Sequence, residues 1–153
     1  MTKIRIREMT AEDAARAAAL EQICFSQPWT AGAFLDSMAA GYSFYFLAEE
    51  DSETEQRVIG LCGCREVAGE GEISNVSVHP EYRRQGIGTE LLQAVLAAGE
   101  RRGITDFTLE VRCSNQAAIG LYETFGFVTE GCRKGFYDKP REDGFVMWKR
   151  QAV

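Results

Sequence analysis

One segment near the middle of the chain combines a strand, a basic glycine turn and a helix. It runs from Val76 to Ala98 and reads VSVHPEYRRQGIGTELLQAVLAA. The first amides of a helix lack partners, and the positive end of the helix dipole attracts anions. Glycines at 86 and 88 carry no Cβ atom, so the backbone can close around phosphate oxygens. The segment therefore predicts an anion-binding strand–turn–helix unit. A tight connection with two solvated arginines, Arg83 and Arg84, is the purely structural alternative.

Two common nucleotide-binding turns do not match this segment. A dinucleotide-binding turn needs a third glycine where Leu91 stands, and it lies early in a strand–helix–strand unit. A Walker A loop needs Gly-Lys followed by Ser or Thr, which this turn lacks. Both mismatches argue against a mononucleotide or dinucleotide site of the usual kind.

The whole chain predicts an α/β fold (α+β in arrangement), with one mixed, mostly antiparallel sheet flanked by helices. Alternating apolar residues indicate strands at 3–9, 43–50, 57–67, 71–80, 106–112, 127–138 and 144–150, the last two around a loop at 139–143. Capping residues and helical periodicity indicate helices at 11–24, 31–41, 88–103 and 115–126. The alternation slips by one between Ile73 and Val76, which predicts a bulge. No repeat is visible, so we expect residues 1–153 to form a single domain.

Composition and charge argue against several classes of protein. The net charge of −6 does not suit general nucleic-acid binding, which needs a basic face. No apolar run approaches the roughly 20 residues of a membrane span, and charges interrupt the N-terminal segment where a signal peptide would be apolar. The five cysteines lack the spacing of a disulfide framework, and a single histidine argues against a zinc site. We expect a cytoplasmic protein with reduced thiols, no metal and no membrane or nucleic-acid partner.

A second motif, LEVRCSNQAAIGLYETFGF, offers a candidate acid–base pair. Glu110 on the strand is a candidate general base, and Tyr122 on the following helix is a candidate general acid. Each has a structural alternative. Glu110 and Arg112 share one face of the strand and would form a surface ion pair, while Tyr122 would be a half-buried aromatic residue. Asn115 by itself indicates a helix cap.

The turn and the order of elements resemble the Gcn5-related N-acetyltransferase family. Arg83-x-x-Gly86-x-Gly88 matches the Q/R-x-x-G-x-G/A signature of that family. The resemblance implies that this turn binds the pyrophosphate of acetyl-coenzyme A and that the bulged strand holds the pantetheine and the thioester carbonyl. The residues it implies for the coenzyme are Val76, Ser77, Val78, Arg83, Arg84, Gln85, Gly86, Ile87, Gly88 and Thr89.

Within that superfamily the chain is similar to the bacterial ribosomal-protein-alanine N-acetyltransferases. The shared motifs are F-x-x-P-W at 25–29 and LEVR-x-SN-x-AAI-x-LYE-x-FGF at 109–127. This resemblance implies that Glu110 is the base, Tyr122 the acid and Asn115 a coenzyme contact. It also implies that the substrate is the N-terminal alanine of a small-subunit ribosomal protein. Family members often read R-x-x-Y-Y in the C-terminal segment, where this chain has Phe136 followed by Tyr137.

The acceptor is expected to be an α-amine attacked directly, without an acyl-enzyme. At pH 7.5 about one-third of α-amino groups are neutral, against roughly 0.1% of lysine side chains, so a modest base suits an N-terminus. Trp29 and Tyr137 are candidate substrate contacts, although Trp29 fits equally well as a cover over the core. For Glu21 we expect a solvated helix face. Acetylation of a lysine or a small amine, and a non-catalytic acetyl-coenzyme A-binding regulator, are the alternatives. The sequence leaves the oligomeric state open.

Overall fold

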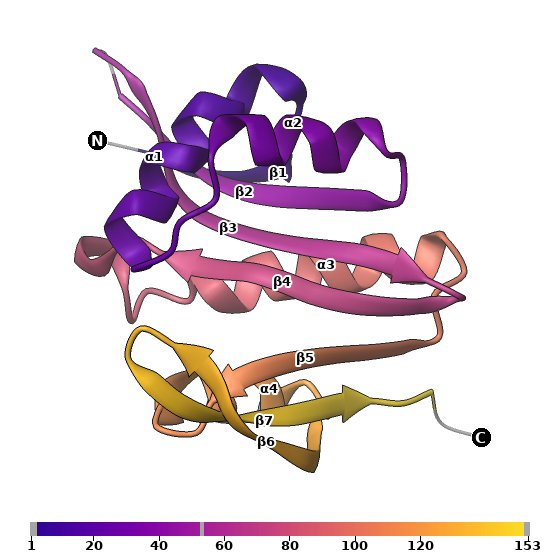
Figure 1. Cartoon of the computed structure of the whole chain (residues 1–153). Helices are drawn as coiled ribbons and strands as arrows, with labels where there is room; N and C mark the ends of the chain where they lie inside the picture. The colour runs from indigo at the N-terminus through magenta and orange to yellow at the C-terminus, as the bar shows by residue number, and fades with distance from the viewer. Residues whose placement is uncertain (1–2, 53, 152–153) are drawn as a thin grey trace.

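The computed structural model describes residues 3–52 and 54–151. Its sheet of seven strands has the order β1-β2-β3-β4-β5-β7-β6, and all neighbouring strands are antiparallel except β4 and β5 (Figure 1). This is the mixed, mostly antiparallel sheet that the sequence predicts. The elements are β1 (Lys3–Glu8), α1 (Ala14–Cys24), α2 (Ala31–Ala39), β2 (Ser43–Asp51), β3 (Gln56–Val67), β4 (Glu70–Val78), α3 (Ile87–Arg101), β5 (Asp106–Arg112), α4 (Gln116–Thr124), β6 (Val128–Asp138) and β7 (Arg141–Lys149), with short 3-10 turns at Ala11–Asp13 and Pro80–Tyr82.

Helices cover both faces of the sheet and bury a core on each (Figure 1). On the α1 and α2 side, Leu20 and Phe34 pack with Tyr45 and Leu61 from the sheet. On the α3 side, the apolar helix face packs against strand side chains that point to the other face of the sheet. This buried set includes Leu91, Leu92, Val95, Leu96, Ile59, Cys62, Cys64 and Phe107. Alternation along the strands thus sends successive side chains into two different cores.

The two parallel strands pair only at their beginnings. Glu70–Glu72 of β4 pair with Asp106–Thr108 of β5, and beyond them the strands separate (Figure 1). A register shift between Leu61 and Gly63 of β3 lies opposite Ser74–Ser77, and Asn75 there has a φ of 56°. This irregularity is the bulge predicted from the slipped alternation. The separation leaves backbone groups of β4 facing an open space, where an external partner can bind them.

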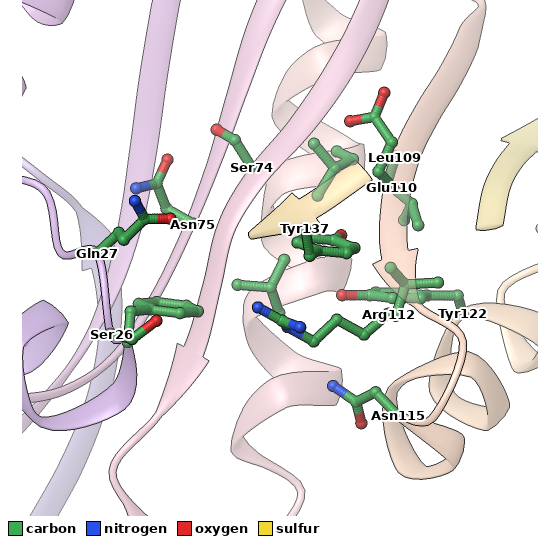
Figure 2. Close-up of a pocket in the computed structure, with 14 residues that line it drawn as sticks. Ser26, Gln27, Ser74, Asn75, Leu109, Glu110, Arg112, Asn115, Tyr122 and Tyr137 are labelled. Atoms are coloured by element: carbon green, nitrogen blue, oxygen red, sulfur yellow. The ribbon is translucent and has the colours of Figure 1, made fainter. Parts of the chain in front are cut away.

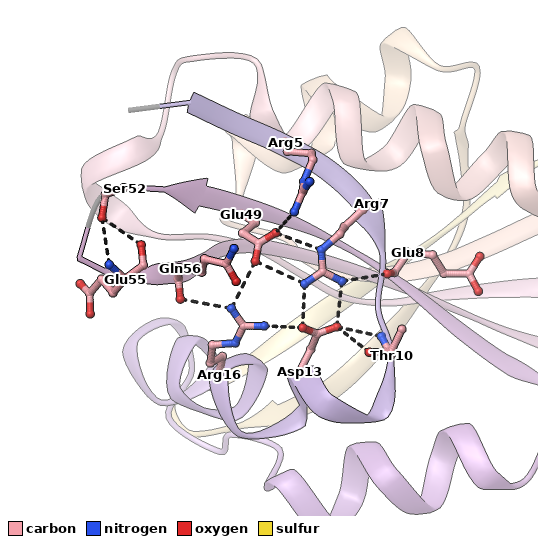
Figure 3. A network of polar contacts seen from close by, with 10 residues as sticks. All are labelled: Arg5, Arg7, Glu8, Thr10, Asp13, Arg16, Glu49, Ser52, Glu55 and Gln56. Carbon is pink, nitrogen blue, oxygen red and sulfur yellow. Dashed lines mark hydrogen bonds and ion pairs between the residues drawn. The ribbon is translucent and has the colours of Figure 1, made fainter. Parts of the chain in front are cut away.

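An ion cluster ties α1 to the first two strands (Figure 3). Glu49 is fully buried, and its carboxylate accepts hydrogen bonds from Arg5, Arg7 and Arg16. Asp13 pairs with Arg7 at 2.7 Å and also accepts the backbone N–H of Thr10, which is half of the predicted capping box. The cluster satisfies two buried carboxylates with three partly exposed guanidinium groups.

The C-terminal hairpin is tighter than the sequence suggests. The expected loop at 139–143 shrinks to Lys139 and Pro140, because Arg141 and Glu142 pair with Asp138 and Tyr137. Polar residues predicted a loop there, but β6 is the edge strand of the sheet and is mostly exposed, so polar side chains are compatible with a strand. Among the helices of residues 3–52 and 54–151, none combines the length and the apolar character needed to cross a membrane.

Candidate active site

A cavity of about 340 Å³ lies between the separated parts of β4 and β5; we call it the strand cavity (Figure 2). Five parts of the chain build it: the α1–α2 loop, the β4 bulge, β5, α4 and β6. It brings Glu110, Tyr122, Asn115 and Tyr137, four of the residues singled out in the sequence, into one place. Its lining consists of Phe25, Ser26, Gln27, Ile73, Ser74, Asn75, Val76, Leu109, Glu110, Val111, Arg112, Asn115, Tyr122 and Tyr137.

Glu110 keeps a partly buried carboxyl at the wall of this cavity. Its side chain is 28% exposed, and the nearest cation is Arg133, 3.9 Å away. Burial and then the negative charge of Glu72 raise the pKa of Glu110, while Arg133 opposes them. The alternative pairing with Arg112 does not occur, because Arg112 donates instead to Glu142 at 3.2 Å and to the carbonyl of Pro140 at 2.8 Å. Glu110 is therefore a carboxyl with a raised pKa and one distant cation.

Tyr122 reaches the same cavity from α4. Asn115 caps this helix, since its Oδ1 accepts the N–H of Ala118 at 3.2 Å, and this cap fixes where the helix begins. The ring of Tyr122 packs 5.9 Å from that of Phe127, and the residue is only 5% exposed. The hydroxyl points into the space between the two strands (Figure 2). Burial raises the pKa of Tyr122, so the phenol keeps its proton at neutral pH.

Tyr137 closes the cavity from β6. The guanidinium of Arg112 lies over its ring at 4.4 Å from the centroid. Burial, followed by the nearby charge of Glu110, raises the pKa of Tyr137 to about 12. The neighbouring Phe136 is 42% exposed and lies outside the cavity lining. The ring that the C-terminal segment supplies to the cavity is thus Tyr137.

A second cavity, of about 610 Å³, lies over the glycine turn; we call it the turn cavity. It contains every coenzyme residue expected from the sequence except Gln85, which is exposed and outside the lining. The turn cavity and the strand cavity share Phe25, Val76 and Asn115. The two cavities therefore adjoin along the edge of β4.

The glycines of the turn have different roles. Gly86 is the N-cap of α3 and has a φ of 80°, a conformation that favours glycine. Gly88 lies in the first turn of α3, and a Cβ atom there would meet Leu121 at 3.4 Å and Val78 at 3.9 Å, which is ordinary contact. The fold itself therefore has room for a side chain at Gly88. Because Gly88 has no side chain, the N-terminus of α3 stays open, as a bound diphosphate would require.

Trp29 fits one of its two expected positions, whereas Glu21 does not lie where the sequence suggests. Trp29 packs against Phe34 at 5.2 Å and Tyr45 at 6.3 Å, outside both cavity linings, which fits the core-cover alternative. The expectation for Glu21 was wrong, because the residue is 1% exposed and accepts the backbone N–H of Trp29 at 3.0 Å. Helical periodicity does not show that the following loop folds back over this face.

Sequence reasoning missed the polar residues opposite Glu110. Ser26 and Gln27 come from the α1–α2 loop, and Ser74 and Asn75 come from the bulge (Figure 2). The available signals were the F-x-x-P-W break and the slipped alternation, which marked these backbone segments without pointing to their side chains. Within the described ranges, no group of three or more His, Cys, Asp or Glu residues is placed to hold a metal ion.

Comparison with known proteins supports the resemblance to N-acetyltransferases that the sequence motifs indicate. Residues 13–127 match the model of the Acetyltransferase (GNAT) family. The chain is 33% identical over 148 residues to the putative ribosomal protein bS18-alanine N-acetyltransferase of Bacillus subtilis strain 168, covering 96% of this chain and 95% of the relative. It is 32% identical over 130 residues to the ribosomal protein bS18-alanine N-acetyltransferase of Escherichia coli K12, covering 84% of each.

A solved structure agrees with these relatives. The crystal structure of the ribosomal-protein-S18-alanine N-acetyltransferase from Escherichia coli superimposes with a TM-score of 0.84 at 29% identity. The match covers 99% of this chain and 96% of the other. The family match spans the glycine turn, Glu110 and Tyr122. This chain belongs to the GNAT family of acetyltransferases.

Proposed function

We propose that this protein transfers an acetyl group from acetyl-coenzyme A to the N-terminal α-amine of a ribosomal protein, the alanine of bS18. One observation carries the proposal: the turn cavity and the strand cavity join at Val76 and Asn115, beside Glu110 and Tyr122. A donor in one cavity and an amine in the other would meet at the acid–base pair. The choice of substrate rests on the two relatives, which are named for acetylation of the alanine of bS18. We further propose that residues 1–153 form one such domain and that it works in the cytoplasm, where ribosomal proteins are made.

The residues of the turn cavity fit the coenzyme. The amides at the start of α3, opened by Gly86 and Gly88, suit a diphosphate, and Arg83 and Arg84 add positive charge. The unpaired edge of β4 from Val76 to Val78 suits the amide groups of a pantetheine chain. When bound, acetyl-coenzyme A supplies the acetyl group as a reactive thioester.

Glu110 would take the proton from the attacking amine. A general base works best when its pKa lies near the working pH, and burial moves the pKa of Glu110 in that direction. An α-amine with a pKa near 7.8 is partly neutral at physiological pH, so it demands little of the base. Its exposure of 28% also leaves Glu110 accessible from the cavity, either directly or through a water molecule.

Tyr122 would return a proton to the departing thiolate. The raised pKa keeps its hydroxyl protonated, and its burial near the junction of the cavities excludes bulk water as a competing donor. Val76 lines both cavities, and backbone N–H groups of β4 near it would stabilise the negative oxygen of the transition state.

The test is an assay with two peptides and acetyl-coenzyme A, followed by thiol release and product mass. The first peptide begins with a free alanine and contains no lysine. The second has a blocked N-terminus and one internal lysine. We expect acetylation of the first only. Acetylation of the second alone would contradict the N-terminal assignment and favour a lysine acetyltransferase. Coenzyme binding without any acetylation, also with the bS18 N-terminal sequence, would favour a regulator.

A further inference from the structure

Two buried polar atoms next to the strand cavity have no hydrogen-bond partner among the described residues. They are Oε2 of Glu21, on α1, and Oδ1 of Asn75, in the β4 bulge. Both atoms are hydrogen-bond acceptors when Glu21 is ionised. An unpartnered buried polar atom costs free energy, so two of them in neighbouring side chains require an explanation.

The side chain of Asn75 lies near the carboxyl of Glu21 and affects its pKa. The amide of Asn75 and the backbone N–H of Trp29 both act on the Glu21 carboxyl and favour its charged form, while burial, the largest effect, raises its pKa. Among the described residues, no cation contributes to the shift of this pKa. The titratable groups that feel its charge are Cys24 on α1 and Tyr45 on β2, both neutral at pH 7. Among the residues that the structure describes, no cation stabilises an ionised Glu21 as Arg7 stabilises Glu49.

A proton on Glu21 satisfies both atoms at once. The protonated Oε2–H can donate to Oδ1 of Asn75, and Oε1 can continue to accept the N–H of Trp29, 3.0 Å away. A carboxylic acid and a carboxamide then pair side by side, with the amide nitrogen of Asn75 turned to the same carboxyl. Every buried donor and acceptor of the contact has a partner in this arrangement.

The contact joins the two walls that face Glu110. Trp29 follows Phe25, Ser26 and Gln27, the loop residues that line the strand cavity. Asn75 is the bulged residue itself, with a φ of 56°, and its neighbours Ser74 and Val76 line the cavity from the other side. Glu21 contacts both the loop and the bulge while contributing no atom to the lining.

We infer that Glu21 is a neutral carboxylic acid paired with the side chain of Asn75, and that this pair positions the α1–α2 loop against the β4 bulge to shape the acceptor side of the site. Glu21 is thus a positioning residue, since it touches neither the coenzyme turn nor the reacting groups. The inference rests on the proposed function only where it concerns the acceptor peptide.

Three variants separate a neutral from a charged Glu21. Glu21→Gln keeps an acceptor for Trp29 and a donor for Asn75, so it should retain the KM of wild type for the alanine peptide. Glu21→Ala should raise that KM about tenfold, because it removes both hydrogen bonds, with an unchanged Kd for acetyl-coenzyme A. Asn75→Gly removes the carboxamide and accommodates the positive φ, and should match Glu21→Ala. The double variant Glu21→Ala/Asn75→Gly should have a KM for the alanine peptide no higher than that of either single variant.

Carbon-13 NMR of glutamate-labelled protein tests the protonation state without any assay of activity. One carboxyl resonance, identified by its absence in Glu21→Gln, should have the chemical shift of a protonated acid at pH 7. A Glu21 resonance at the ionised position, or a Glu21→Gln variant as impaired as Glu21→Ala, would overturn the inference. An inactive wild type with a protonated Glu21 would instead count against the proposed function alone.

Discussion

The guanidinium of Arg112 lies over the ring of Tyr137, with its Cζ 4.4 Å from the ring centroid. The same guanidinium donates to Glu142 at 3.2 Å and to the carbonyl of Pro140 at 2.8 Å. Arg112 therefore ties β5 to the β6–β7 hairpin and does not pair with Glu110, two residues earlier on the same face, whose nearest cation is Arg133 at 3.9 Å. This choice of partner keeps the candidate base available.

Arg112→Lys should weaken peptide binding because a lysine keeps the charge but loses the planar stack on Tyr137. We expect KM for the alanine peptide to rise about three- to tenfold, with the Kd of acetyl-coenzyme A unchanged. Arg150→Lys is the matched control, since Arg150 stacks on Trp148 at 4.2 Å away from both cavities. Equal effects of the two variants would mean that the Arg112 stack does not shape the site.

Glu110→Gln should lower kcat by about 10²–10⁴ through loss of the general base. Wild-type activity should fall as the pH drops through the raised pKa of Glu110, because only the ionised form accepts a proton. The variant should lack this acid limb. A raised folded-state pKa also means that ionised Glu110 lowers folding stability as the pH rises, so the variant should melt no lower than wild type at pH 7. An unaltered pH–rate profile would assign the limb to another group.

Tyr122→Phe should reduce kcat more than it changes the Kd of the coenzyme. The phenol is buried and protonated, and only its hydroxyl is lost, so the packing against Phe127 is kept. We expect a fall in kcat of about 10² or more, measured with a saturating alanine peptide. Tyr82→Phe is the control, because Tyr82 lines the turn cavity but donates its hydroxyl to Glu50 at 2.6 Å, away from the acid–base pair. Full activity of Tyr122→Phe would exclude the hydroxyl as the acid.

Gly88→Ala should preserve the fold and impair coenzyme binding. A Cβ atom at Gly88 meets only Leu121 and Val78 at ordinary contact distances, and alanine favours a helix over glycine by up to about 1 kcal/mol. The methyl group would instead occupy the space above the helix N-terminus, so calorimetry should show a weaker Kd for acetyl-coenzyme A. Gly120→Ala in α4, where nothing lies within 4 Å, should stabilise the helix without changing that Kd. Unchanged coenzyme binding by Gly88→Ala would contradict the assigned cradle.

The ion cluster of Figure 3 should make the protein sensitive to acid. Hydrogen bonds from Arg7 lower the pKa of Glu49 to about 2 and that of Asp13 to about 2, from ordinary values of 4.5 and 3.8. Depressed carboxyl pKa values stabilise the fold above the unfolded-state values, and this stability is lost as the pH falls towards 2. Glu49→Gln should cost about 3 kcal/mol at pH 7 and flatten the acid limb in urea titrations. The exposed Glu100→Gln should leave both unchanged.

Features that depend on neighbours along the chain could be predicted from the residues alone. Thr30, Asn115 and Gly86 mark helix starts through local hydrogen bonds or a local φ, so the element order and the glycine turn could be predicted. The bulge was visible because one slipped residue reverses which face the following apolar side chains occupy. The candidate pair of Glu110 and Tyr122 came from a single motif of 19 residues, in which the two lie only 12 positions apart.

Contacts between residues far apart in the sequence could be identified only from the folded structure. Glu21 looks like a solvated helix residue until the loop at Trp29 and the bulge at Asn75 fold over it. Arg112 has Glu110 as its neighbour on the strand, yet the β6–β7 hairpin offers a carboxylate, a carbonyl and an aromatic ring together. Burial and charge compensation are sums over contacts far apart in the sequence, and local periodicity contains no information about them.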